Sequence, residues 1–200
     1  MGRTSEARDH LLASAAELMH ARGYTAVGVS EICREAGVQK GSFYHFFPSK
    51  QALALAVLDA LEVAVHQRLD ESLRAAGQPL DRLRSFCQQP YRKRSMSCDG
   101  SGQFLGCPAG NLALEMSAQD PVLRDRLAEI FELQIAALAE VIAEAVDEGE
   151  LPNAVDPADA ARAVLAHLEG MILLAKTRND PEILAKAADQ ALRLVSPAAA

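Results

Sequence analysis

Three helix-stopping residues, Gly23, Gly37 and Pro48, divide the first fifty positions of this chain into short segments. Apolar residues recur at helical spacing before the first of them, and Ser30 is placed to cap the second segment. Three short helices with a glycine-containing turn between the second and third are the pattern of a helix-turn-helix. We expect helices over 5–22, 31–36 and 40–47.

The third of these segments has two faces of different chemistry. At 100° per residue, its aromatic side chains fall on one arc; they are Phe43, Phe46 and Phe47. The opposite arc carries a cation, an aromatic hydroxyl, an imidazole and a glycine; these residues are Lys40, Tyr44, His45 and Gly41. Since glycine has no side chain to hold another surface away, we expect this arc to face a partner closely.

The remaining chain is rich in Ala and Leu, has only 4% aromatic residues and no Trp, and therefore favours helices over strands. Spacing and stop signals predict six further helices, over 49–75, 81–94, 108–117, 121–147, 157–177 and 181–195. The predicted fold is all-α with about nine helices. A three-helix domain over 1–50 is joined through the helix 49–75 to a helical bundle over 51–200.

Charge is distributed unevenly along the chain. Residues 1–50 hold six Lys or Arg against five Asp or Glu, a net charge of +1, whereas the remaining 150 residues have a net charge of −8. A near-neutral end can approach phosphates that would repel an acidic body. The pattern favours nucleic-acid binding through the N-terminal end alone.

The sequence lacks the signals of several other classes of protein. The four cysteines show no CxxC spacing and the histidines do not cluster near them, so we expect no metal site and no cofactor. No apolar run has the length of a membrane span, and the N-terminus lacks the layout of a signal peptide. We expect a cytoplasmic protein with reduced thiols and no membrane partner.

Two segments carry a resemblance to a known family. The stretch from Gly23 to Cys33, and then AGVQKGSFYHFFPSK over 36–50, closely resembles the DNA-binding signature of the TetR/AcrR repressors. The resemblance implies an all-α repressor in which Gln39, Lys40, Ser42, Tyr44 and His45 face double-stranded operator DNA. It also implies that Lys50 holds a phosphate beside the start of the fourth helix, where backbone N–H groups attract anions.

One position departs from the family pattern. Many members have Thr or Ser just before the second helix to bind phosphate, whereas this chain has Val27 and Gly28. Ser30 or backbone amides would have to replace that contact. Because few side chains of one protomer reach base edges, specificity requires two copies on a palindrome. The resemblance implies a homodimer through the last two helices, and the interface candidates are Leu165, Leu168, Ile172, Leu184, Ala188 and Leu192.

The effector is open to two interpretations. A small-molecule inducer would occupy an apolar cavity among the helices of residues 80–175. Alternatively, Cys107 lies where a loop enters a helix, a position that can favour the thiolate. The segment GCPAGNLALE over 106–115 resembles TetR-like regulators that sense electrophiles or oxidants through a cysteine, and Cys98 is a candidate resolving partner. The alternative for Cys107 is a small buried residue at a helix start, as Cys33 and Cys87 look like core thiols.

Two remote alternatives complete the hypotheses. A thiol-dependent enzyme would pair Cys107 with a distant His, but no base stands at a recognisable spacing from a nucleophile, so we expect no enzyme. A protein-only helical adaptor would be indifferent to a Tyr44→Ala substitution in any nucleic-acid assay. The sequence favours a DNA-binding repressor released by an effector.

Overall fold

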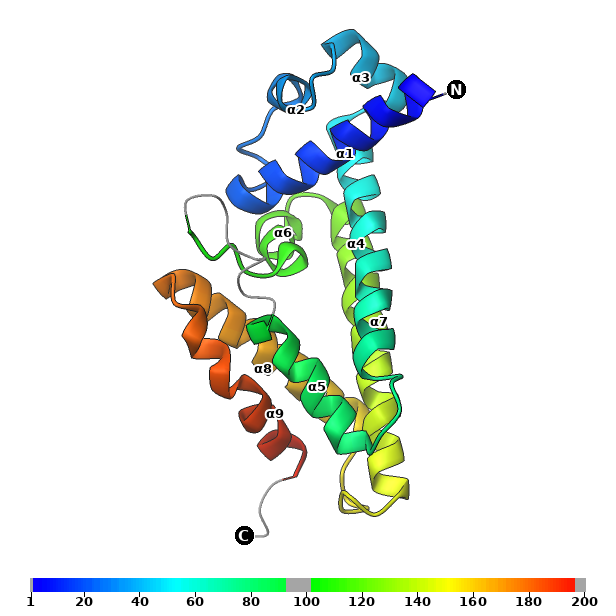
Figure 1. Cartoon of the computed structure of the whole chain (residues 1–200), viewed down its shortest axis with the longest axis vertical. Coiled ribbons are helices and arrows are strands. Elements are labelled where there is room, and N and C mark those ends of the chain that lie inside the picture. Colours follow the sequence, from blue (N-terminus) through cyan, green and yellow to red (C-terminus); the bar gives the residue numbers. More distant parts are fainter. Residues whose placement is uncertain (1, 93–101, 197–200) are drawn as a thin grey trace. The chain divides into compact units, whose positions relative to one another are not determined.

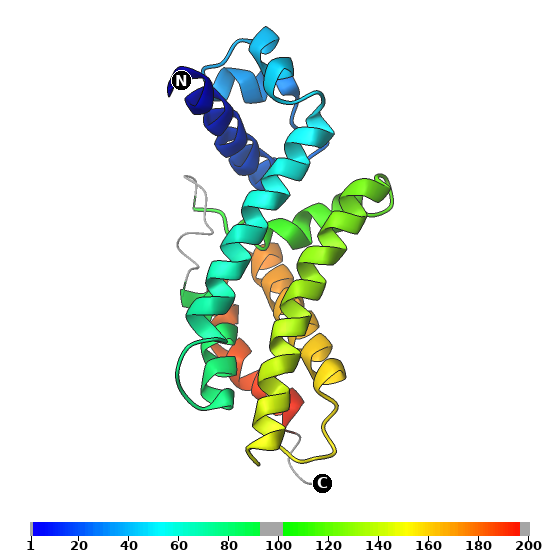
Figure 2. The same ribbon diagram turned by 90° about the vertical axis from the view of Figure 1, so that its right-hand side faces the viewer.

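The structure is a computed structural model that describes residues 2–92 and 102–196. Every regular element within these two ranges is helical (Figure 1; Figure 2 turns the view by 90°). The predicted all-α fold is therefore confirmed. The elements are α1 (Gly2–Arg22), α2 (Val29–Glu35), α3 (Lys40–Phe46), α4 (Lys50–Ser72), α5 (Pro79–Arg92), α6 (Pro108–Met116), α7 (Pro121–Asp147), α8 (Pro157–Arg178), η2 (Pro181–Lys186, a 3-10 helix) and α9 (Ala187–Val195).

The chain forms two compact units that interleave in sequence. The N-terminal unit comprises Met1–Val63 and Pro108–Ala128, and the C-terminal unit comprises Ala64–Cys107 and Glu129–Ala200. Helix α6 and the first turns of α7 thus belong with the N-terminal helices. The chain passes from one unit to the other within α4, between Cys107 and Pro108, and within α7.

The core of the N-terminal unit lies where α1 contacts α2 and α3 (Figure 1). Helix α1 presents Leu11 and Ala15, both fully buried, four residues apart on one face. Apolar side chains of the next helices complete this core; they include Ile32, Cys33, Phe43 and Phe47. The prediction that Cys33 is a core thiol is confirmed.

The N-terminus of α2 differs from the sequence expectation. The helix begins at Val29, and its N-cap is Gly28, whose carbonyl accepts from the N–H groups of Glu31 and Ile32 at 3.0 and 3.1 Å. Ser30 already lies inside the first turn and is exposed, so the prediction that it caps the helix was wrong. Helix α4 is capped by Ser49, whose Oγ accepts from the Ala52 N–H at 3.0 Å.

In the C-terminal unit, α9 packs against both α5 and α8 (Figure 1). The Asp156 side chain caps α8 by accepting from the Asp159 N–H, and Asn179 ends the helix in the left-handed conformation. The helix predicted over 181–195 is in fact divided, since its first six residues form the tighter η2 that commonly opens a helix. Cys87, the second expected core thiol, is buried on α5.

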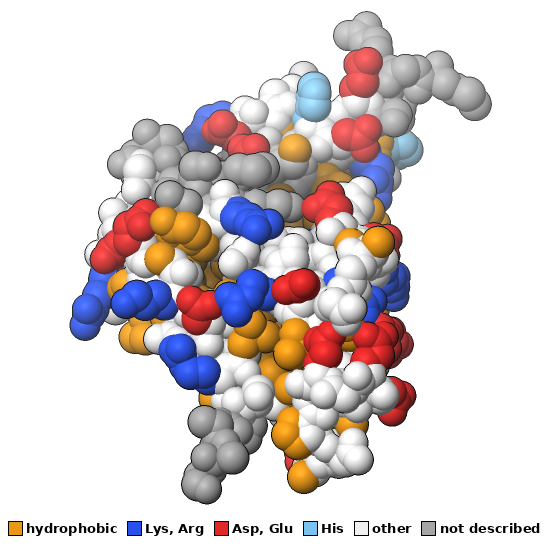
Figure 3. Space-filling model, turned by 60° about the horizontal axis from the view of Figure 1, so that its bottom comes forward, with side chains coloured by type: hydrophobic (Ala, Val, Ile, Leu, Met, Phe, Trp, Pro, Cys, Tyr) orange, Lys and Arg blue, Asp and Glu red, His pale blue; other side chains and the backbone are white. Residues whose placement is uncertain are grey.

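The surface carries charges of both signs. On the face shown in Figure 3, Lys and Arg lie among Asp and Glu, with hydrophobic side chains between them. None of the described helices combines the length and the apolar character that crossing a membrane would require.

Candidate nucleic-acid interface and regulatory pocket

Helix α3 separates its aromatic and polar side chains as the spacing predicts. Phe43 is fully buried and Phe47 nearly so, while Phe46 is partly covered. Tyr44 has 54% of its surface exposed, although its ring meets Phe43 edge-on with the centroids 5.1 Å apart. The remaining polar residues of the predicted interface are also exposed; they are Gln39, Lys40, Gly41, Ser42 and His45. A seven-residue helix is thus held by its aromatic face and presents its polar face outward.

The turn before α3 is set by one glycine. Gly37 has a φ of +65°, a left-handed conformation that side chains other than hydrogen disfavour. The next residue closes the end of α2, because the Val38 N–H donates to the Cys33 carbonyl at 2.9 Å. Gln39 then serves as N-cap of α3 without using its side chain, which leaves the amide outside the helix.

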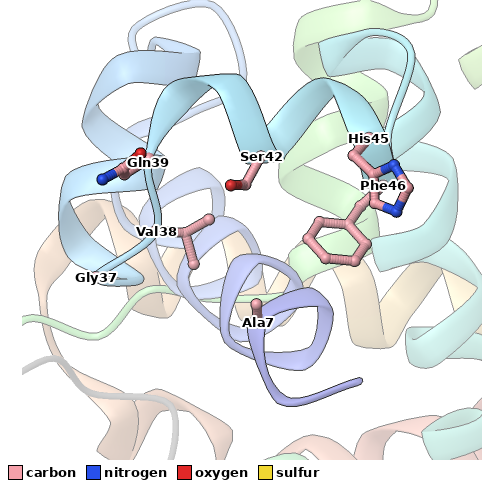
Figure 4. Close-up of a pocket in the computed structure, with 7 residues that line it drawn as sticks. All are labelled: Ala7, Gly37, Val38, Gln39, Ser42, His45 and Phe46. Atoms are coloured by element: carbon pink, nitrogen blue, oxygen red, sulfur yellow. The ribbon is translucent and has the colours of Figure 1, made fainter. Parts of the chain in front are cut away.

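An open pocket lies beside this turn, between α3 and α1 (Figure 4). In the close-up, Val38, Ser42 and Phe46 point toward the space above Ala7, while Gln39 and His45 stand at its two ends. The lining residues are Ala7, Gly37, Val38, Gln39, Ser42, His45 and Phe46. Three of the side chains predicted to face DNA, Gln39, Ser42 and His45, therefore border a concave surface.

Lys50 and Ser30 are placed differently from the family expectation. The Lys50 ammonium donates to the carbonyls of Tyr24 and Val27 at 2.9 and 3.0 Å and lies 4.0 Å from the centre of the Tyr24 ring. Burial lowers the pKa of Lys50, and the charge of Glu115 acts in the opposite direction. Since two of its three donors bind the loop before α2, Lys50 holds that loop in place. Its predicted phosphate contact, like that of exposed Ser30, stays a prediction.

A second candidate site lies inside the C-terminal unit, in a small pocket between α4, α5, α7 and α8. Three polar side chains, Arg68, Gln134 and Glu169, meet there among apolar residues. The Arg68 guanidinium donates to the Gln134 carbonyl oxygen and lies 5.1 Å from the centre of the Phe86 ring. The remaining lining residues are Phe86, Pro90, Leu165, Leu168 and Ile172.

The polar groups of this pocket are only partly satisfied by hydrogen bonds. Among the described residues, Nε of Arg68 has no hydrogen-bond acceptor although it is buried. Burial raises the pKa of Glu169, and neither its hydrogen bond with the Cys107 thiol nor the charge of Arg68 fully offsets this. The arrangement offers an unsatisfied donor and a carboxyl group to anything that enters.

Sequence reasoning had not assigned a role to Arg68 or Glu169, yet a signal was present. On α8, Glu169 is four residues after Leu165 and three before Ile172, which places it on the apolar stripe. On α4, Arg68 is three residues after the buried Val65 and so lies on the same face. A charged residue within an apolar stripe indicates a buried polar partner.

Cys107 is partly exposed and immediately precedes α6. Gly106 before it has a φ of +78°, a conformation that favours glycine, and a Cβ added there would lie 3.2 Å from the Lys176 side chain. Cys98, the candidate resolving partner, lies outside the described residues. No group of three or more potential ligands that could hold a metal ion occurs among the residues that the structure describes.

The predicted dimer-interface residues are divided by burial. Four of them already pack within the protomer, namely Leu165, Leu168, Leu184 and Ala188. Ile172 and Leu192 are partly covered. The large apolar side chains that α8 and α9 expose are others, Leu173, Leu174 and Leu194, each with about half of its surface accessible (47, 52 and 48%).

Comparison with known proteins gives two family matches. The model described as "Bacterial regulatory proteins, tetR family" matches residues 11–57, and that described as "Tetracyclin repressor-like, C-terminal domain" matches residues 79–191.

Individual relatives agree with the family matches. The chain is 35% identical to the transcriptional regulator AcuR of Cereibacter sphaeroides over 90% of its length and 81% of that protein. It is 32% identical to the repressor NemR of Escherichia coli K12, over 91% and 90% of the two chains. Among solved structures, a TetR regulatory protein from Rhodobacter sphaeroides superposes with a TM-score of 0.85 at 33% identity, covering 94% and 98%. Reduced NemR gives 0.84 at 31% identity, covering 97% and 99%.

Proposed function

Because the chain belongs to the TetR family of bacterial transcriptional regulators, we propose that it represses transcription as a homodimer on a palindromic operator and is released by a small-molecule inducer. The observation that carries this proposal is α3. Its buried aromatic face fixes the helix, and its polar face is exposed. Such a helix fits the recognition element of a helix-turn-helix in the major groove.

The proposed DNA contacts divide by chemistry. Lys40 and Lys50 carry the charge that phosphates require, and these contacts position the protein without reading sequence. Base-edge contacts fall to side chains with hydrogen-bonding groups, namely Gln39, Ser42, Tyr44 and His45. Gly41, between them, lets the backbone approach: a Cβ there would meet no atom of the protomer, so its absence serves an outside surface.

We place the dimer interface on α8 and α9. The exposed Leu173, Leu174 and Leu194 support this, because large apolar side chains in water favour association with a partner surface. The residues first expected there, such as Leu165 and Leu168, would then support the interface from beneath. Two copies joined in this way would hold two α3 helices for successive major grooves.

The pocket around Arg68 is our proposed effector site. Its free volume of about 10 Å³ is no more than a water molecule needs, so an inducer must widen the pocket to enter, and the Arg68 Nε that lacks an acceptor suits an inducer with an oxygen to offer. An inducer acts only by binding the DNA-incompetent arrangement more tightly than the competent one.

A second candidate is a switch operated by chemistry at Cys107. The observation that favours it is the hydrogen bond between the Cys107 thiol and Glu169, which places an acceptor beside the sulfur. Alkylation or oxidation would add bulk at the junction with α6.

A single titration tests the function. The palindromic DNA beside the protein's own gene is the probe, and binding is measured for the wild type and for Tyr44→Ala. We expect tight binding that the substitution weakens while the melting temperature is unchanged. Equal binding by both proteins, or none by the wild type, would contradict the proposed interface.

A repetition after treatment with a thiol alkylator separates the two effector hypotheses. Release of DNA that disappears in Cys107→Ser supports the chemical switch. Binding that persists after alkylation supports a reversible inducer.

A further inference from the structure

The loop between α1 and α2, residues 23–28, is held by one carboxylate. Glu115 of α6 accepts from the Tyr24 N–H at 2.7 Å, from the Thr25 N–H at 2.8 Å and from the Thr25 hydroxyl at 2.5 Å. A Cβ added to Gly23 would lie 2.9 Å from a Glu115 oxygen, so the loop is shaped around this side chain. Three donors on one carboxylate form a charge-assisted latch.

Opposite charges hold the two sides of this loop. Glu115 binds its N–H groups, whereas the Lys50 ammonium binds its carbonyls at Tyr24 and Val27. Burial by itself raises the pKa of Glu115, but the hydrogen bonds from Thr25 and Tyr24, together with the charge of Lys50, bring it below its ordinary value. The carboxylate is therefore ionised at neutral pH. The loop ends at Gly28, the N-cap of α2, so its position sets where the helix-turn-helix begins.

The other end of α6 is joined to the C-terminal unit. The helix starts at Pro108, directly after Cys107, and at 1.5 Å per residue Glu115 lies about 10 Å further along its axis. The segment before it is held within the C-terminal unit, where Gly106 lies close to Lys176 and Cys107 binds Glu169. The short helix α6 is thus joined at its start to a segment anchored in the C-terminal unit, and it carries the latch in its last turn.

We infer that Glu115 is the positioning residue through which a displacement of the Gly106–Cys107 segment reaches the α1–α2 loop. A helix of nine residues moves as a rigid piece, and hydrogen bonds weaken steeply once donor and acceptor separate beyond about 3.5 Å. A shift of about 1 Å along α6 therefore breaks the latch instead of bending it. The helix-turn-helix then loses the constraint that places α2 and α3 for DNA.

The test uses Cys107 as a handle for moving α6. In a Cys98→Ser parent, N-ethylmaleimide is added until mass spectrometry shows one adduct, on the peptide that carries Cys107. Cys33 and Cys87 are buried, and burial raises the pKa of both, so they react slowly. Operator affinity is compared before and after labelling in the parent, in a Glu115→Ala variant of it and in an Asp125→Asn variant.

Asp125→Asn is the matched control, because it removes one exposed carboxylate from the same unit as Glu115. Asp125 forms an ion pair with its chain neighbour Arg124. We expect labelling to weaken operator binding on the order of tenfold in the parent and in Asp125→Asn, a typical allosteric coupling. In Glu115→Ala the labelled and unlabelled proteins should bind alike. An equal response in Glu115→Ala, or no response in the parent, would overturn the inference.

A second readout does not require DNA, so it separates this inference from the proposed operator binding on which the affinity measurement rests. Amide hydrogen exchange of a peptide covering 23–28 reports the latch directly. We expect protection in the unlabelled parent, faster exchange in its Cys107 adduct, and fast exchange in Glu115→Ala whether labelled or not. An adduct that leaves this segment as protected as before refutes the latch, even if Glu115→Ala fails to bind DNA.

Discussion

Each unit contains a glutamate whose surroundings shift its pKa, and the two shifts have opposite directions. Glu115 in the N-terminal unit receives three hydrogen bonds from a loop, and its pKa falls despite the raising effect of burial. Glu169 in the C-terminal unit is partly buried beside a thiol and one arginine, and the loss of solvent around it raises its pKa. Both residues follow apolar positions on helices and look alike in the sequence. The number of donors around a carboxylate, rather than the residue type, decides which protonation state the fold favours.

The same contrast extends to the functional groups of each unit. The N-terminal unit exposes Lys40, Tyr44 and His45, which therefore contribute little to its stability. The C-terminal unit encloses Arg68 and Glu169, whose removal disturbs the core. Substitutions should thus separate function from stability in the first unit and couple them in the second.

Arg68→Met should give the largest change in stability. The substitution leaves Gln134 and Glu169 without their cationic partner inside a pocket, and we expect a loss of about 3 kcal/mol of unfolding free energy. Arg74→Met, two residues beyond the end of the same helix, is the matched control, because its pair with Asp70 is exposed and adds only about 0.5 kcal/mol. Urea unfolding measures both. Equal losses would mean that the pocket is not a distinct buried site.

Tyr44→Ala and Lys40→Ala should weaken operator binding without lowering stability. We expect roughly a tenfold or greater loss for Tyr44, from the contacts to DNA alone. For Lys40 the slope of log affinity against log salt should fall by about one, as expected for a single lost phosphate contact. Lys186→Ala, on η2, serves as the control for charge. If a drop in melting temperature accounted for the lost binding, function and stability would not be separable in the N-terminal unit.

The two glutamates predict opposite responses to pH. Since the folded pKa of Glu169 is raised, its contribution favours the fold below the unfolded pKa and is lost as pH rises through the folded value. Since that of Glu115 is lowered, its contribution is present above the unfolded pKa and is lost as pH falls. As pH rises toward neutral, the melting temperature of Glu169→Gln should therefore increase relative to the wild type. That of Glu115→Gln should decrease relative to the wild type. Parallel curves would contradict the assigned surroundings.

Much of the N-terminal unit was predictable because local rules decide it. The spacing of Phe43 and Phe47 places them on one face of α3, and a bundle of three short helices has few other places for such volume. Gly37 indicated the turn because its conformation is one that glycine adopts easily. The helix order of the whole chain followed from the same stop signals.

Contacts between distant segments were not predictable in the same way. Glu115 meets residues about 90 positions earlier in the chain, and no local pattern specifies that pairing. Lys50 was expected to hold a phosphate from family resemblance, but only tertiary structure brings the carbonyls of Tyr24 and Val27 within its reach. The interface residues chosen from the apolar stripe of α8 include side chains that the protomer itself buries, because a stripe does not reveal which neighbour covers it.

The smallest predicted effect concerns two serines that the sequence treats alike. Ser49 accepts from the Ala52 N–H, so Ser49→Ala should cost about 1 kcal/mol of stability through the lost cap of α4. Ser30 lies within the first turn of α2 and makes no capping bond, so Ser30→Ala should stay within about 0.5 kcal/mol of the wild type. Any loss of operator affinity in Ser30→Ala would then report a phosphate contact rather than a weakened helix. If both serines destabilise the protein equally, Gly28 is not the residue at which α2 begins in solution.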